Sequence, residues 1–396
     1  MHVLYLPKWY PNRYDPMHGL FIKRHAHSVL KHCNISVLYV HPNKLSPNGK
    51  KNKESINYEL TTSNNNKLHE VIIYYKKFNC RLKTIALIIN NSRFLLSYLK
   101  GFKIIKKLAG KPDILHVHVL TRIGIIAFIN KIITGTPYLI TEHWSRYLPK
   151  TNTYKGFVRK FFTRIVVKNA SAVLPVTKNL KEAMLNHGLK NKNYTVIPNV
   201  VDTELFIPFD KITGREKKRI VHVSCFEDRS KNISGILNVL KKLSKKRQDF
   251  ECYLVGDGID FEKLKNYANK LKIKDNFVFF TGLLEGSKLI ESINNSDLML
   301  MFSNYENMPV VINESFACGV PVISSNVGGI SEYVNTETGE LIERKDEKAL
   351  LNSLVNFLND NKKYDRENIR EFAVKNFSKE AVSMKILNIY KSVLNR

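Results

Sequence analysis

The feature that most constrains the fold is a regular alternation of short apolar runs with longer, helix-like stretches. Each run spans four to six residues and is bounded by turn-forming residues. This rhythm is typical of parallel sheets covered by helices on both faces, so we expect an α/β fold. The predicted strands are Val3–Leu6, Ile35–Val40, Ile114–Val119, Tyr138–Thr141, Ala172–Val176, Ile220–Val223, Glu251–Val255, Phe277–Phe280, Leu298–Phe302 and Pro321–Ser324.

The length of 396 residues predicts two domains rather than one. The segment 197–214 is the best candidate for a linker, because it contains Pro198, Pro208 and Gly214 and coincides with a change in charge. We therefore predict two doubly wound domains, over residues 1–200 and from residue 201 onward, separated by a cleft. Sheets of this kind bind ligands beyond the carboxyl ends of their strands.

The net charge of +28 is concentrated in the first half of the chain. Residues 1–200 hold 33 Lys and Arg against 7 Asp and Glu, whereas residues 201–396 hold 30 against 28. A basic surface attracts anionic partners within a Debye length of about 8–10 Å. Anionic lipid and nucleic acid both fit this charge. We expect no specific nucleic-acid binding, because the sequence has no recognition-helix, zinc or aromatic RNA-binding motif.

Two basic segments in this half also carry apolar residues at helical spacing. The segment Tyr154–Lys168 predicts a basic amphipathic helix, and Arg81–Lys107 mixes apolar and basic residues in a similar way. Each is also typical of a core helix with a solvated polar face, and a Lys- and Asn-rich composition is another explanation. We expect the first domain to dock on an anionic membrane surface.

No apolar stretch is long enough for a membrane span, since about 18–20 residues are needed and the closest, Ile123–Ile133, contains Asn130 and Lys131. Met1–Leu6 is a strand-like run without a basic leader, so we expect a cytoplasmic protein, peripheral on the inner face of the membrane. The five scattered cysteines are expected to be reduced: Cys33, Cys80, Cys225, Cys252 and Cys318.

The most informative window is 297–332, which predicts a strand, a helix starting near Pro309, a stop at Gly319 and a second strand. Glu306 falls in the loop before this helix and Glu314 falls on the helix. The helix N-terminus, near Asn307, Met308, Pro309 and Val310, offers free amides and a partial positive charge that favour a phosphate group. Two carboxylates beside a bound diphosphate can accept hydroxyl protons from two sugars.

This window resembles the signature of the family-four retaining glycosyltransferases of GT-B fold. Glu306 and Glu314 match the Glu-x7-Glu pattern of that family, and the phrases 317–323 and 328–332 match the motifs that follow it. The resemblance extends over nearly the whole chain, through the phrases 112–119, 137–143, 196–206, 255–258 and 277–282. It implies two Rossmann-like domains, the second over 201–378, and a C-terminal helix over 379–396 that crosses back onto the first.

The resemblance also assigns further site residues. Lys231 occupies the position of a lysine that reaches the donor diphosphate, while Cys225 stands where an arginine is usual and Arg229 is a geometric substitute. Alternation in the strand 114–118 places His116 and His118 on one face. The resemblance gives His118 a contact to the donor sugar, and a core role suits His116.

His143 follows the strand 138–141 and is also expected at the cleft. Gly19 matches a glycine in the first βα loop of the family, where His18 stands beside it. Catalysis is assigned to His118, Lys231 and Glu306.

We predict a retaining hexosyltransferase that moves sugar from a UDP- or GDP-sugar to a glycan or lipid-linked acceptor in surface polysaccharide synthesis. The nucleotide sugar is a co-substrate, and no cofactor or metal is expected because Lys231 and the helix dipole supply positive charge. A GT-B epimerase or phosphorylase and, more remotely, a basic nucleic-acid-binding protein are the alternatives.

Overall fold

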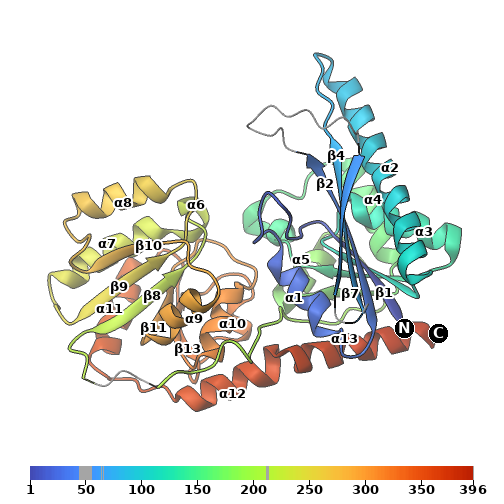
Figure 1. Ribbon diagram of the computed structural model, residues 1–396. Coiled ribbons are helices and arrows are strands. Elements are labelled where there is room, and N and C mark those ends of the chain that lie inside the picture. Colours follow the sequence, from blue (N-terminus) through green and yellow to red (C-terminus); the bar gives the residue numbers. More distant parts are fainter. Residues whose placement is uncertain (44–55, 64, 66, 211–213, 396) are drawn as a thin grey trace.

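The computed structural model describes residues 1–43, 56–63, 65, 67–210 and 214–395. It confirms the α/β class and shows two domains, each built on one sheet with helices on both faces (Figure 1). The first domain lies at the right of the view and the second at the left, with the last helix running beneath the first.

The sheet of the first domain has seven strands in the order β3-β4-β2-β1-β5-β6-β7. Every neighbouring pair is parallel except β3 and β4, which form an antiparallel pair at one edge. The strands are β1 (His2–Pro7), β2 (Asn34–Asn43), β3 (Ile56–Ser63), β4 (Leu68–Lys76), β5 (Ile114–His118), β6 (Tyr138–Glu142) and β7 (Ala172–Pro175).

Side chains of the central strands are buried on both faces of this sheet. Along β1, Leu4 and Leu6 enter one apolar cluster while Val3 and Tyr5 enter another, as expected for alternating side chains. The covering helices are α1 (Leu20–Ser28), α2 (Lys83–Ala109), α3 (Arg122–Thr134), α4 (Phe157–Asn169) and α5 (Lys178–Asn186).

The second domain has a six-stranded, fully parallel sheet in the order β10-β9-β8-β11-β12-β13. Its strands are β8 (Lys218–Val223), β9 (Phe250–Val255), β10 (Val278–Gly282), β11 (Leu298–Met301), β12 (Val322–Ser325) and β13 (Gly339–Ile342). Its helices are α6 (Asp228–Lys231), α7 (Ile233–Ser244), α8 (Phe261–Lys270), α9 (Ser287–Asn294), α10 (Val310–Ala317), α11 (Glu347–Leu358) and α12 (Arg366–Phe377).

The chain returns to the first domain at its C-terminal end. Ser378 separates α12, which packs on α10, from α13 (Lys379–Leu394), which packs on α1. The hydroxyl of Tyr390 on α13 lies 3.0 Å from that of Tyr5 and 2.6 Å from Nδ1 of His116. The last helix is therefore part of the core of the first domain.

All ten strands expected from the sequence are present within three residues of their predicted bounds. Three further strands were not predicted: β3, β4 and β13. In the predicted β-helix-β unit, Pro309 precedes the first turn of α10 rather than lying inside it, while Gly319 ends the helix with φ +68° as expected. Both amphipathic segments form helices, as α2 and α4.

None of the helices in the described ranges is long and apolar enough to cross a membrane. All five cysteines are free thiols in the structure. Cys33, Cys252 and Cys318 are buried in packing positions, whereas Cys80 and Cys225 are exposed.

Candidate active site

A buried ion pair joins Lys231 to Glu306 where the second domain faces the first. Nζ of Lys231, at the end of α6, lies 2.6 Å from Oε1 of Glu306, and the hydroxyl of Ser303 donates to the same oxygen at 2.8 Å. Burial has the largest single effect and lowers the pKa of Lys231, but the charge and hydrogen bond of Glu306 together with the charges of Cys225 and Glu227 raise the pKa above its ordinary value. Lys231 is thus a fixed positive charge.

The loop that carries Glu306 leads directly into α10. Pro309 is the N-cap residue with φ −67° and ψ 125°, and Val310 is the first helical residue. Amides in this first turn have no acceptor within the helix and point toward its N-terminus. A Cβ atom on Gly328 would lie 2.0 Å from the carbonyl oxygen of Glu306, and its φ is +62°, so the predicted glycine loop supports the Glu306 loop by close backbone contact.

Glu314 lies on α10 and is only 3% exposed. Its Oε1 atom accepts a hydrogen bond from the guanidinium of Arg24 on α1 at 2.6 Å. The sequence analysis missed Arg24, because its partner comes from the other domain and no spacing along the chain indicates the pair. An ion pair between the two domains therefore covers the carboxylate of Glu314.

Asn307 also joins the two domains. Its Nδ2 donates to the carbonyl oxygen of His143 at 2.9 Å, and its Oδ1 accepts from the hydroxyl of Thr177 at the same distance. Asn199 donates to the carbonyl oxygen of Met308 at 3.4 Å. The loop before α10 is thus hydrogen-bonded to the carboxyl ends of β6 and β7.

Glu332, which completes the glycine phrase, is another connection between the domains. Its two carboxylate oxygens accept from the amides of Lys178 and Asn179, at 2.7 and 2.8 Å, and so cap the N-terminus of α5 in the first domain. A Cβ atom on Gly329 would lie 2.3 Å from the methyl group of Thr177, so only glycine allows this approach.

The two predicted cleft histidines form one hydrogen-bonded chain. His143 Nδ1 lies 3.0 Å from Oδ1 of Asn199, and His143 Nε2 lies 3.1 Å from Nδ1 of His118. Burial lowers the pKa of both imidazoles well below its ordinary value, so both rings are neutral. Since Oδ1 only accepts, the protons of this chain lie on both Nδ1 atoms, and Nε2 of His118 is an acceptor.

That Nε2 atom of His118 is fully buried and has no hydrogen-bond partner within the described residues. His116 differs, because its two ring nitrogens bond to Tyr390 at 2.6 Å and Thr141 at 2.7 Å. The hydrogen bonds of His116 thus suit a core role, whereas Nε2 of His118 is a buried acceptor without a partner among the described residues.

The remaining predicted residues lie around this centre. Gly19 is the N-cap of α1 with φ +71°, and a Cβ atom there would lie 2.4 Å from the carbonyl of Trp9. Nδ1 of His18 lies 3.6 Å from the carboxylate of Asp15. Arg229 is exposed on α6, two residues before Lys231, and its carbonyl oxygen accepts a hydrogen bond from Nδ2 of Asn304 at 3.0 Å.

Among the residues that the structure describes, no three His, Cys, Asp or Glu side chains are grouped so as to hold a metal ion. The structure instead gathers Lys231, Glu306, Asn307 and the start of α10 against His143, which in turn contacts His118.

Comparisons with known proteins agree with this arrangement. The family described as Glycosyltransferase Family 4 matches residues 58–205, and the family described as Glycosyl transferases group 1 matches residues 206–375. The N-acetyl-alpha-D-glucosaminyl L-malate synthase of Bacillus anthracis is 26% identical over 296 residues, which cover 71% of this chain and 75% of that protein.

A putative teichuronic acid biosynthesis glycosyltransferase of Bacillus subtilis is 25% identical over 251 residues, covering 62% of this chain and 61% of that protein. The structure of HepE from Anabaena, in complex with UDP and glucose, superposes with a TM-score of 0.72 at 16% identity and covers 98% of this chain and 99% of that one. The chain is therefore a member of the family-four glycosyltransferases and has their GT-B fold.

Proposed function

We propose that the chain transfers a hexose from a UDP- or GDP-sugar to a hydroxyl group of a glycan or lipid-linked acceptor, with retention of the anomeric configuration, in surface polysaccharide synthesis. The observation that carries this proposal is the fixed cation Lys231, held on Glu306 beside the N-terminus of α10. The UDP and glucose of the solved HepE structure and the biosynthetic role named for the Bacillus subtilis relative support the same reading.

In this mechanism the diphosphate lies between Lys231 and the first amides of α10, at Val310 and Val311. The bond from sugar C1 to the diphosphate oxygen breaks, and the acceptor oxygen bonds to C1 on the same face. The acceptor proton passes to the departing diphosphate oxygen. Lys231 and the helix dipole stabilise the developing charge, so a metal is not needed for this role. Arg229, exposed on the same short helix, is the candidate second cation.

The carboxylates and His118 orient the sugars. Glu306 uses Oε1 for Lys231 and Ser303, which leaves Oε2 for a hydroxyl of the donor sugar. The buried Nε2 of His118 accepts from another hydroxyl. Glu314 is assigned to the ribose, and since Arg24 covers it, the first domain must move away from α10 before the nucleotide binds.

A thermal-shift series tests the donor assignment directly. UDP-, GDP- and ADP-sugars are each added to the purified chain, because a ligand of the native state raises the melting temperature by mass action. We expect a UDP- or GDP-sugar to raise it and the Lys231→Ala variant to lose the shift. No shift with any nucleotide sugar at millimolar concentration would contradict the proposal. Appearance of an altered free nucleotide sugar would instead identify an epimerase.

We further propose that the first domain docks peripherally on an anionic membrane surface. Helices α2, α3 and α4 all border one cavity, and each exposes large apolar side chains beside basic ones. Phe157 is 83% exposed, Ile133 76% and Ile88 65%. An interfacial helix buries such residues among lipid headgroups while Lys and Arg contact anionic phosphates.

Sedimentation with vesicles tests this docking. We expect binding to vesicles of phosphatidylglycerol and phosphatidylcholine at low salt, and loss of binding in high salt and in the Phe157→Ser/Phe161→Ser variant. The matched control is Lys263→Glu/Lys270→Glu on α8 of the second domain, which keeps binding. A wild-type chain that stays in the supernatant at low salt would refute the docking and leave the donor assignment standing.

A further inference from the structure

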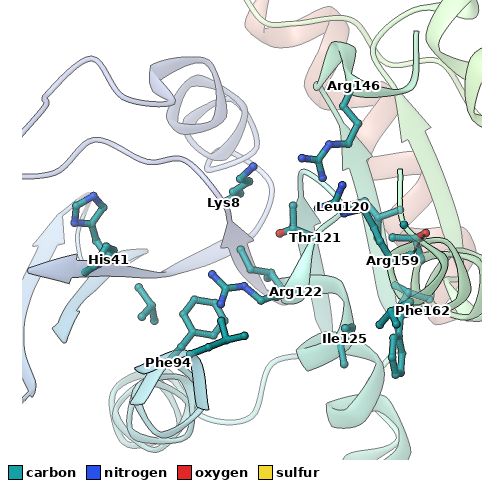
Figure 2. A pocket seen from close by; sticks show the side chains of 18 of the residues that line it. Lys8, His41, Phe94, Leu120, Thr121, Arg122, Ile125, Arg146, Arg159 and Phe162 are labelled. Atoms are coloured by element: carbon teal, nitrogen blue, oxygen red, sulfur yellow. Dashed lines mark hydrogen bonds between the residues drawn. The ribbon is translucent and has the colours of Figure 1, made fainter. Parts of the chain in front are cut away.

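A cavity of about 1000 Å³ lies in the first domain, at the carboxyl ends of β1, β2 and β5. Helices α2, α3 and α4 form its walls, and the loops after β5 and β6 form its floor (Figure 2). It could not be predicted from the sequence, because its lining comes from eight separate segments of the chain between Lys8 and Val166.

Five basic residues line this cavity: Lys8, Arg122, Arg146, Lys155 and Arg159. Figure 2 shows Lys8 and Arg146 extending toward one another, with Arg122 on the opposite side of the space. In the part of the chain that the structure describes, none of the five forms an ion pair with a carboxylate. The cluster therefore lacks a counter-ion.

The charge of Glu142 acts on Lys8, but the carboxylate oxygens of Glu142 are hydrogen-bonded to backbone amides. It is fully buried, and its oxygens accept from the backbone amides of Leu120, His143 and Trp144 at 2.8–3.0 Å. Burial raises the pKa of Glu142 to about 7, so its charge at neutral pH is only partial. It positions the floor of the cavity rather than neutralising the cluster.

Aromatic contacts hold the cations in place without neutralising them. Nζ of Lys8 lies 3.2 Å and the guanidinium carbon of Arg146 3.5 Å from the ring centroid of Trp144, and Arg122 packs on Phe94. Nε of Arg146 is buried and has no hydrogen-bond partner within the described ranges. Burial and the charge of Arg146 lower the pKa of Lys8 to about 8. A bound anion would supply the missing partner.

Much of the remaining cavity wall is apolar and leads to the exposed apolar surface of the helices. Its apolar members are Leu87 and Phe94 on α2, Ile125 on α3, and Phe157, Val158 and Phe162 on α4. Leu87 is 61% exposed, and Phe157 continues onto the surface proposed to meet the membrane. A small hydrophilic anion would leave this wall without a partner.

Two consecutive residues, His143 and Trp144, connect the candidate donor site to the cation cluster. Trp144 contacts Lys8 and Arg146, while the carbonyl of the preceding His143 accepts from Asn307 of the second domain. We propose that this cavity binds the acceptor, and that the acceptor is a phosphate or diphosphate ester of a long apolar chain. Its phosphate lies on Lys8, Arg122, Arg146 and Arg159, and its chain lies along α2 and α4. The inference rests on the proposed function only in identifying this ligand as the acceptor of the transferred sugar.

Tryptophan fluorescence tests the inference on the unmodified chain. The chain has two tryptophans, and Nζ of Lys8 lies within 4.7 Å of the ring centroid of Trp9 and 3.2 Å of that of Trp144. We expect farnesyl diphosphate to change this fluorescence with saturation. Farnesol tests the chain without the anion, and inorganic diphosphate and glucose 6-phosphate test the anion without the chain. Each should bind at least tenfold more weakly.

The Arg146→Met and Arg122→Met variants should each weaken farnesyl diphosphate binding about 10- to 100-fold, the range for loss of a charge-assisted hydrogen bond. The matched control Lys263→Met, on the second domain, should bind as the wild type does. Both arginine variants should keep the thermal shift produced by the nucleotide sugar. If the wild type binds farnesyl diphosphate but shows no thermal shift with any nucleotide sugar, only the donor assignment is overturned.

Two outcomes would overturn the inference itself. One is equal binding of glucose 6-phosphate and farnesyl diphosphate, which would indicate a soluble phosphorylated acceptor. The other is farnesyl diphosphate binding that Arg122→Met and Arg146→Met both leave unchanged in folded protein. Either result would show that the apolar wall and the cations do not bind the same ligand.

Discussion

Replacing Lys231 with alanine removes the cation that the proposed mechanism places on the leaving diphosphate. Loss of one preorganised group that stabilises transition-state charge lowers kcat by about 10²–10³, or about 2.7–4 kcal/mol. We expect this loss in turnover, measured as release of the nucleoside diphosphate from the sugar nucleotide with acceptor present.

The same substitution also affects folding, because it leaves Glu306 9% exposed and without its cation. Breaking a buried pair from one side costs about 3–5 kcal/mol. The hydroxyl of Ser303, which still donates to Glu306, offsets part of this cost. The free energy of unfolding, from urea denaturation followed by circular dichroism, should fall accordingly.

Two variants separate chemistry from stability. Adding Glu306→Gln to Lys231→Ala removes the unpaired charge and should restore much of the stability but none of the turnover. Lys242→Ala is the matched control, since Lys242 pairs with Glu347 at 2.7 Å on an exposed surface, where such pairs contribute about 0.2–1 kcal/mol. A folded Lys231→Ala chain with kcat within about threefold of wild type would refute the role of Lys231.

Three further predictions follow from other contacts. Glu314→Gln should raise the KM for the nucleotide sugar, and an effect confined to the KM for the acceptor would contradict the ribose assignment. Arg24→Met should lower the free energy of unfolding by about 3–5 kcal/mol because it strands a buried carboxylate, and adding Glu314→Gln should recover part of it; equal stability of Arg24→Met and wild type in urea would show that the pair is not formed. Lys8→Met should stabilise the chain at pH 7. The pKa of Lys8 is about 8 in the folded chain against 10.5 in the unfolded chain, so the unfolded state binds more protons between these values and the wild type gains stability as pH rises. The advantage of Lys8→Met in urea denaturation should therefore shrink between pH 8 and pH 10, and a difference independent of pH would count against the crowding of cations.

The sequence predicted the ten core strands because each is mostly apolar, as is typical of buried parallel strands. It missed β3 and β4, whose residues include charged and polar side chains such as Glu59 and Glu70 and which pair at the sheet edge. It also missed β13, which is only four residues long and whose two central residues are only partly buried. Edge and short strands have a weaker apolar signal.

At the candidate site, sequence motifs identified the residues that belong to one local segment, such as Glu306 and Glu314. They did not identify Arg24, Asn199 or Thr177, because these act through contacts between domains that are far apart in the chain. The sequence predicted a cleft between the domains but not the hydrogen bonds across the domain boundary, where Glu314 and Asn307 are buried. Docking of the domains, and not the local pattern, decides these contacts.

A crystal structure of the chain with a UDP- or GDP-sugar tests the central claim most directly. The account predicts the diphosphate within hydrogen-bond distance of Nζ of Lys231 and of the amides of Val310 and Val311, and the ribose on Glu314 with Arg24 moved away. A nucleotide bound at another place in the second domain, with the Lys231–Glu306 and Arg24–Glu314 pairs unchanged, would contradict it.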